Sequence, residues 1–393
     1  MNKKLISLAI AGAVATPFAG QAGTLNVANQ DITLSGGITG AYFYTTENTD
    51  PTVGSKQDAF AVPDALIDIS SAAKPGGMGF TLGIGTLGEN SLASGGSAIN
   101  AIGSSGSVGV QYGWVTVMPM DGLKVDAGIL ATNVGYEVSP TYSNPNILLG
   151  LLWSAQPTYY TGARATYTWN NMSFYAEANK GADPNTGKPG GAIGASGNFA
   201  GTDVAFNYIM VASNNNFGSI NTPATSFGGS AVVPVDRIAA GSLIDVIVKH
   251  KIGSIDLAAD LNYLMKSDRE KKLEKASFSP ASAGDDNAIG IAFYASMPVM
   301  DKVTVPVRVE YVSDGTSGLY GLTMYDNNAT SGNGLVKNNA ITFTVTPTYH
   351  FSDSTFVRAE LAYVSADKKS FLDDKGKATD SNMVLGVQGG VLF

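Results

Sequence analysis

The sequence predicts an all-β protein folded as a transmembrane antiparallel β-barrel of about 16 strands. Three observations predict this fold: many short segments alternate apolar and polar residues, the connections between them alternate between short and long, and the chain ends on an aromatic residue. In the last segment, one strand face carries Met383, Leu385, Val387, Gly389, Val391 and Phe393. Because terminal residues of soluble proteins usually fray, an ordered strand ending on Phe393 favours a position at a membrane edge.

The first 22 residues have the pattern of a cleaved signal peptide. A basic start with Lys3 and Lys4 precedes an apolar core over 5–14, and small residues at Gly20 and Ala22 fit a cleavage site after Ala22. The apolar core is shorter than the about 20 residues that span a bilayer as a helix. We therefore expect residues 1–22 to be removed after export and residues 23–393 to form a single barrel.

Composition restricts the partners. Residues 1–22 hold two of the 24 basic residues and no acid, so the net charge changes from −8 to −10 without them. This argues against nucleic acid, whose phosphates are neutralised by clustered Lys and Arg. The chain has no cysteine, which excludes disulfides and thiolate metal sites. Its 47 glycines, 17 tyrosines and 16 phenylalanines suit a curved sheet with aromatic belts.

Sixteen segments fit the alternating pattern, with about 14 or 18 strands as alternatives if a weak pair is misjudged. The segments are 31–46, 58–72, 78–87, 107–118, 122–130, 158–169, 171–181, 191–199, 202–213, 239–251, 253–267, 285–297, 302–313, 339–350, 354–366 and 381–393. The short connections carry Asn, Asp, Gly and Pro, which form tight turns. Outer-membrane barrels combine an even strand number with short periplasmic turns and long external loops.

Alternation within the strands separates two faces. In 302–313, valines at 303, 305, 307 and 309 share one face, whereas Arg308 and Glu310 share the other. Periodicity alone does not tell a lipid-exposed apolar face from a buried one, but the signal peptide and Phe393 favour lipid outside and polar residues inside. Since an eight-stranded barrel is already filled by side chains, 16 strands would enclose an aqueous channel.

A family resemblance lies within residues 112–180. The run 122–128 (GLKVDAG) leads into Asn133-Val134-Gly135-Tyr136-Glu137, and a Thr-Gly-x-Arg strand returns over 161–167 (TGARATY). This arrangement resembles the second, OmpL-like type of β-barrel porin, and the C-terminal segment resembles the closing strand of bacterial outer-membrane barrels. The resemblance implies an outer-membrane channel and gives little information about its substrate.

Residues 131–157 form the third long loop, which in sixteen-stranded general porins folds into the barrel and narrows the pore. The apolar run 147–152 within this otherwise polar loop predicts packing against the inner wall. The alternative is a loop folded over the rim. On the first interpretation Tyr136, Glu137, Asn144 and Asn146 line the loop side of a constriction.

Strand parity predicts an acidic interior, and one sign of charge in a cleft concentrates the opposite ions. Weak cation preference follows. The inward acids are Asp64, Asp68, Asp126, Glu177, Asp245, Asp256, Asp260, Glu310 and Glu360, and the inward bases are Lys124, Arg164, Lys249, Arg308 and Arg358. The repeated Arg-x-Glu pairs predict lumenal salt bridges. Alternatively, Arg164, Arg308 and Arg358 form a basic wall across from Glu137.

Catalytic signals are weak. The two histidines, His250 and His350, each fall beside a short turn without the neighbours of a Ser-His hydrolase. The run 83–88 matches a dinucleotide fingerprint by its letters, but no helix follows it. We expect no enzymatic activity, no cofactor and no metal site.

The leading hypothesis is a passive outer-membrane channel for small hydrophilic solutes, in contact with lipid and lipopolysaccharide. The alternative is a structural or adhesive barrel with an occluded lumen and ligand-binding external loops. Fold-level analogy with general porins favours a homotrimer. The transported solute, the pore radius and gating do not follow from the sequence.

Overall fold

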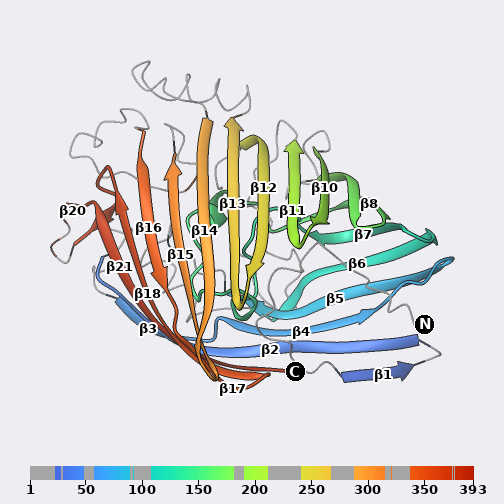
Figure 1. Cartoon of the computed structure of the whole chain (residues 1–393), viewed down its shortest axis with the longest axis horizontal. Helices are drawn as coiled ribbons and strands as arrows, with labels where there is room; N and C mark the ends of the chain where they lie inside the picture. Colours follow the sequence, from blue (N-terminus) through green and yellow to red (C-terminus); the bar gives the residue numbers. More distant parts are fainter. Residues whose placement is uncertain are drawn as a thin grey trace.

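The structure is a computed structural model, and it describes residues 23–27, 30–47, 57–88, 92, 108–180, 190–210, 240–266, 287–314, 320, 337–373, 375 and 377–393. Its main feature is one antiparallel sheet in which strands consecutive in sequence lie side by side (Figure 1). The predicted signal peptide lies outside the described residues. No described helix is long and apolar enough to cross a bilayer.

The sheet closes into a barrel of 16 strands, as predicted. Closure is made by the last strand, which pairs with the first from Gly37–Leu392 to Thr45–Val384. The strands are β2 (Gln30–Thr45), β3 (Gln57–Ala61) with β4 (Asp64–Ser71), β5 (Gly77–Leu87), β6 (Gly109–Met120), β7 (Leu123–Ala131), β8 (Tyr159–Trp169), β9 (Met172–Lys180), β10 (Gly190–Phe199), β11 (Thr202–Met210), β12 (Ala240–Ile252), β13 (Ile255–Lys266), β14 (Asn287–Met300), β15 (Val303–Ser313), β16 (Asn339–Val345) with β17 (Thr348–Ser352), β18 (Thr355–Ala366) and β21 (Ser381–Leu392).

Closure leaves each strand with a partner on both sides, which satisfies the backbone polar groups that hydrocarbon would leave unpaired. The connections alternate as expected: tight turns such as 170–171 and 200–201 stand at one end, and long loops such as 132–158 stand at the other. We name these the short-turn end and the long-loop end. In the tight turns, Asn170 and Ala200 adopt positive φ angles of 53° and 51°.

Two predicted strands are interrupted, and both interruptions contain a proline. Segment 58–72 divides into β3 and β4 around Pro63, and segment 339–350 divides into β16 and β17 around Pro347. Proline has no amide hydrogen and cannot donate to the ladder.

Two further pairings were not predicted. Strand β1 (Gly23–Val27) pairs with the start of β2, and β19 (Phe371–Leu372) pairs with β20 (Ala378–Thr379) within a long connection.

The outward face is apolar along the whole barrel. Exposed outward residues away from the strand ends include Phe293, Phe343, Leu361 and Leu385. Aromatic residues gather near the short-turn end, namely Tyr167, Trp169, Phe174, Phe199, Phe206, Tyr349, Phe351 and Phe393. This arrangement matches the apolar band and aromatic girdle of a membrane barrel. The backbone of Phe393 pairs with Gly36, with N···O distances of 2.9 and 3.1 Å.

The inward face has two layers. Charged and polar residues such as Asp64, Arg308 and Glu360 are buried in the lumen around the middle of the strands. Toward the long-loop end, inward positions are apolar and pack together; they include Phe43, Ile209, Leu243, Leu264, Val312, Val364 and Val384. The interior is therefore not uniformly hydrophilic.

We expect the cost of an outward charge to depend on depth. Val309 lies on the outward face at the middle of β15, whereas Phe351 lies outward at the short-turn end. Val309→Arg should lower the free energy of unfolding by about 2–4 kcal/mol, and the control Phe351→Arg by about 0–1 kcal/mol. Urea unfolding in lipid vesicles measures both. Equal costs would contradict the assignment of the outward face to lipid.

Candidate functional site

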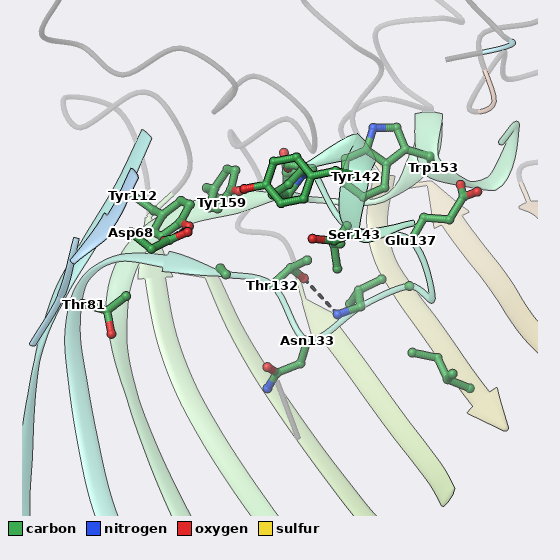
Figure 2. A pocket seen from close by; sticks show the side chains of 18 of the residues that line it. Asp68, Thr81, Tyr112, Thr132, Asn133, Glu137, Tyr142, Ser143, Trp153 and Tyr159 are labelled. Atoms are coloured by element: carbon green, nitrogen blue, oxygen red, sulfur yellow. Dashed lines mark hydrogen bonds between the residues drawn. The ribbon is translucent and has the colours of Figure 1, made fainter. Parts of the chain in front are cut away.

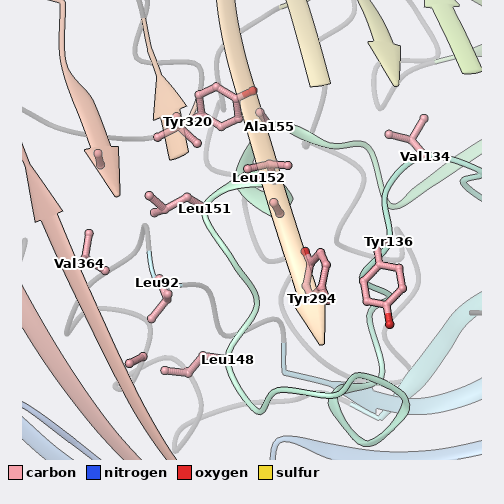
Figure 3. Packing of buried hydrophobic residues seen from close by; sticks show 14 of the residues in the cluster. Leu92, Val134, Tyr136, Leu148, Leu151, Leu152, Ala155, Tyr294, Tyr320 and Val364 are labelled. Carbon is pink, nitrogen blue, oxygen red and sulfur yellow. The ribbon is translucent and has the colours of Figure 1, made fainter. Parts of the chain in front are cut away.

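Loop 132–158 lies inside the barrel, and most of its residues are buried. It contains two short 3-10 turns, Thr141–Ser143 and Leu152–Ala155. Its apolar run, 147–152, packs against the apolar inward layer near Val364 and Tyr294 (Figure 3). Hydrophobic burial therefore holds one part of the loop in the lumen.

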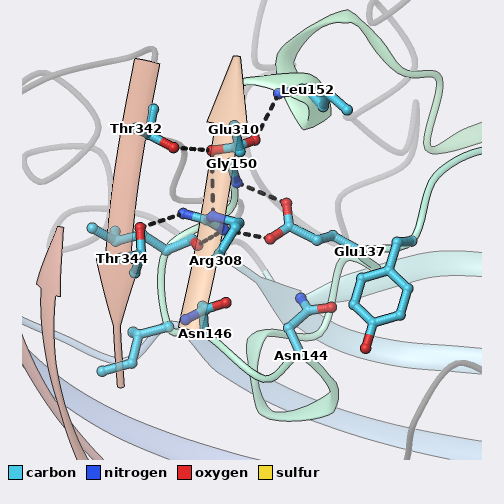
Figure 4. A network of polar contacts seen from close by, with 12 residues as sticks. Glu137, Asn144, Asn146, Gly150, Leu152, Arg308, Glu310, Thr342 and Thr344 are labelled. Atoms are coloured by element: carbon cyan, nitrogen blue, oxygen red, sulfur yellow. Dashed lines mark hydrogen bonds and ion pairs between the residues drawn. The ribbon is translucent and has the colours of Figure 1, made fainter. Parts of the chain in front are cut away.

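Arg308 of β15 connects the loop to the wall (Figure 4). Its guanidinium forms an ion pair with Glu137 of the loop, another with Glu310 at 3.3 Å, and donates a 2.7 Å hydrogen bond to the Leu148 carbonyl. Glu137 in turn accepts a 2.7 Å hydrogen bond from the backbone amide of Gly150. The geometry at Gly150 is close, since a Cβ atom there would lie 2.1 Å from a Glu310 carboxylate oxygen.

A second connection is made by Arg358 and Glu360 of β18. Arg358 donates to the backbone carbonyls of Asn144 and Thr141 at 2.8 and 2.9 Å. Glu360 accepts from the amides of Ile147 and Leu148, the latter at 3.0 Å. Arginines thus bind loop carbonyls and glutamates bind loop amides, which satisfies backbone groups that lie outside regular structure.

Two further wall strands also contact the loop. On β13, Asp260 accepts from the Tyr136 amide at 2.9 Å and from the Gln156 side chain at 3.1 Å. On β8, Arg164 binds the Asn133 side chain at 3.0 Å and forms a 2.8 Å ion pair with Glu177. The loop is therefore attached to several separate strands around the wall.

All seven residues predicted to line a constriction are at most 5% exposed. Tyr136 packs against Tyr294 with ring centroids 4.2 Å apart, and Asn146 donates to Thr346 at 2.7 Å. Asn144 bonds within the loop, to the backbone of Val138. Arg164, Arg308 and Arg358 bind the loop as described above. Glu137 is the one member of this set that borders the cavity described next.

A cavity of about 390 Å³ lies between the loop and the wall formed by β4, β5, β6, β11 and β12 (Figure 2). Aromatic side chains form much of its lining, namely Tyr112, Trp114, Tyr142, Trp153 and Tyr159. Polar groups at its surface include Thr81, Thr132, Asn133 and Ser143. Asp203 and Lys249 also line it, near the short turns of β11 and β12, which places the cavity toward the short-turn end.

One row of residues across three strands shapes this cavity. Asp68 of β4 lies opposite Gly83 of β5, and Gly83 lies opposite Tyr112 of β6. The Tyr112 ring covers Gly83, since a Cβ atom there would come within 2.5 Å of the ring. Its hydroxyl donates to the Asp68 carboxylate. Tyr112 also stacks on Tyr159, with centroids 5.3 Å apart and an interplanar angle of 17°.

The carboxylates at the cavity have different surroundings. Glu137 is paired with Arg308, and Asp203 interacts electrostatically with Lys249. Asp68 accepts the Tyr112 hydroxyl and forms no ion pair with any residue that the structure describes. The lining therefore holds one carboxylate without a basic partner among the described residues.

Strand parity predicted the inward position of Asp68 but not the aromatic cavity. Tyr112 has an inward position in an alternating strand, which was the available signal. Its contact with Asp68 depends on the register of β4, β5 and β6, and register is not contained in the alternation of one strand.

The histidines bind threonines near the short-turn end. His250 lies 3.0 Å from the Thr202 hydroxyl, and His350 lies 3.1 Å from that of Thr304. Within the described ranges, no group of three or more potential metal-binding side chains comes together.

Arg308 provides a sharp test of how the loop is held. Arg308→Gln leaves Glu137 and Glu310 buried without their cation, so we expect the free energy of unfolding to fall by about 3–5 kcal/mol. Urea unfolding in vesicles measures this change.

The control is Lys251→Gln. Lys251 is paired with Asp256 at 3.0 Å and both side chains are more than half exposed, so we expect a loss within about 1 kcal/mol. Similar losses for the two variants would show that Arg308 does not stabilise the docked loop as described.

Comparisons with known proteins agree with the barrel fold. The model of the family described as "Putative beta-barrel porin-2, OmpL-like" matches residues 31–393. No curated protein sequence matches the chain significantly.

Solved structures share the fold at low identity. The outer-membrane channel DcaP of Acinetobacter baumannii has a TM-score of 0.57 at 11% identity, with 94% of this chain and 99% of that chain covered. A loop-deletion mutant of OmpT of Vibrio cholerae has a TM-score of 0.56 at 12% identity, with 92% and 99% covered. An anion-selective porin from Comamonas acidovorans has a TM-score of 0.55 at 13% identity, again with 92% and 99% covered.

Proposed function

Because this chain belongs to the OmpL-like β-barrel porin-2 family, we propose that it is a passive outer-membrane channel for small hydrophilic solutes. The observation that carries the proposal is the cavity of about 390 Å³ beside the docked loop. A barrel of this strand number is wide enough to hold both a loop and a water-filled passage. No cofactor or energy source enters the proposal.

In this proposal loop 132–158 is the constriction. Its contacts with β8, β13, β15 and β18 hold it in the lumen, and the cavity lies toward the short-turn end, bordered by β4–β6 and by β11–β12. The long-loop end would face the exterior and lipopolysaccharide, with the short turns in the periplasm. Glu137 contributes to the passage directly, and the other predicted constriction residues contribute by holding the loop.

We also propose a weak cation preference. Acids outnumber bases in the cavity lining, where Asp68, Glu137 and Asp203 face Lys249. Excess negative charge in a water-filled cleft raises the local cation concentration. The effect is expected to be small, because Glu137 and Asp203 have basic partners.

A second candidate is a structural or adhesive barrel with an occluded lumen. The near-complete burial of 147–152 and the apolar layer at the long-loop end favour it, because both fill space that a wide pore would leave to water. The two candidates differ in one measurable property, conductance.

Assembly as a homotrimer is a further proposal. A trimer form is described for the in-vitro folded OmpT of Vibrio cholerae, which has a TM-score of 0.50 at 11% identity. The continuous apolar outward face supplies surface that subunits or lipid would cover.

Planar-bilayer recording tests the proposed channel. We expect steady, ohmic single-channel currents from the folded protein in potassium chloride. A correctly folded barrel that inserts without conducting would support the structural candidate instead.

Reversal potentials test the charge preference separately. Under a salt gradient, the sign should correspond to K⁺ passing more readily than Cl⁻, and the preference should weaken at high ionic strength because of screening. An anion-selective reversal potential would contradict the proposed preference while leaving the channel intact.

Glu360→Ala tests the role of the loop as a constriction. It removes the acceptor for the amides of Ile147 and Leu148 and for the Thr346 hydroxyl, each an unsatisfied group costing about 1–3 kcal/mol. We expect larger and noisier currents, because the loop is held less firmly. Asp256→Ala is the control: it removes an inward acid that is exposed and paired with Lys251 at 3.0 Å, and should leave the noise unchanged. Equal effects would indicate that charge, and not loop position, sets the current.

A further inference from the structure

The cavity beside the loop is lined by aromatic side chains and a carboxylate, two kinds of group that both attract cations. Tyr112 and Tyr159 stack, and Trp114 lies with its ring centroid 5.8 Å from that of Tyr112. Tyr142 and Trp153 come from the loop and line the same space. Aromatic faces are negative and attract cations.

Asp68 adds a full negative charge to this aromatic group. Its carboxylate accepts the Tyr112 hydroxyl, so the carboxylate and the stacked rings lie together (Figure 2). A partly desolvated carboxylate that has no basic partner among the described residues attracts a positive ligand more strongly than an exposed one would.

From this geometry we infer that the cavity is a binding site for a small organic ammonium cation, such as a quaternary or protonated amine with an apolar body. The inference rests on the proposed channel function and names a substrate class for it. An apolar body would contact the ring faces, while the positive group would lie near Asp68. The cavity volume, about 390 Å³, is within the range of small-molecule sites.

A neutral polar solute such as a sugar is the alternative occupant. Sugars also stack on aromatic rings, and Thr81, Asn133 and Ser143 would offer them hydrogen bonds. The position of Asp68 favours the cation, because a neutral ligand gains little from the negative charge of a carboxylate. Charge dependence therefore separates the two ligands.

Tryptophan fluorescence gives a measurement of binding that does not depend on conductance. The chain has three tryptophans; Trp114 and Trp153 line the cavity, whereas Trp169 is 60% exposed on the outward face. A Trp169→Phe background leaves both reporters in the cavity. Choline is the probe, and its neutral isostere 3,3-dimethyl-1-butanol and glucose are the comparison ligands.

We expect choline to change the emission saturably and to reduce the K⁺ current over the same concentration range. The neutral isostere should bind about tenfold more weakly than choline. Asp68→Asn keeps an oxygen that can accept the Tyr112 hydroxyl and should weaken choline binding about tenfold. Asp126→Asn removes the same unit of inward charge outside the cavity and should leave choline binding unchanged.

Equal binding of choline and its neutral isostere, or choline binding unaffected by Asp68→Asn, would overturn the inference. So would preferential binding of glucose. If the protein conducts but choline changes neither its emission nor its current, the binding site is refuted and the channel is not. A saturable choline response in a barrel that does not conduct would support the site and refute the channel.

Discussion

The arrangement of the lumen depends on how Arg308 is neutralised. Its guanidinium is fully buried and reaches Glu137 of the loop, Glu310 of its own strand and the carbonyl of Leu148. Because an unpaired buried charge is strongly unfavourable, the loop cannot leave this position without replacing those contacts. Hydrophobic packing of 147–152 acts in the same direction. The position of the loop is thus determined both by the pairing of the buried Arg308 and by the burial of the apolar run 147–152. The loop is therefore part of the barrel interior.

Glycines on the wall and in the loop make this interior possible. Gly83 leaves room for the Tyr112 ring, and Gly150 of the loop leaves room for the Glu310 carboxylate. A larger side chain at either position would meet these groups at 2.5 Å or less. The cavity and the docked loop therefore depend on glycines opposite large side chains, a complementarity that links neighbouring strands and distant segments.

The sequence predicted the barrel, its 16 strands and the inward positions of its charged residues, because alternation and turn chemistry are local properties. It did not predict the breaks at Pro63 and Pro347. There the alternation of apolar and polar residues continues, although proline has no amide hydrogen to donate to the neighbouring strand. It also predicted the Arg308–Glu310 pair from parity, but not the contact of Arg308 with Leu148, which lies 160 residues away. Such contacts follow from the path of the loop and from register, and neither is encoded in one segment.

The total charge on inward-pointing side chains therefore differs from the charge that borders the space left open in the lumen. Strand parity counts Glu310, Glu360 and Arg358 as lumenal, yet their charged groups are used in binding the loop. A permeating ion would meet only the charges that border the remaining space, and among the residues that line the described cavity these are Asp68, Glu137, Asp203 and Lys249. In the proposed channel, selectivity would then depend on a few side chains near the aromatic cavity. In the proposed channel the docked loop would act on ion passage twice, because it occupies volume and because its backbone groups and Glu137 bind charged side chains that the strands direct inward.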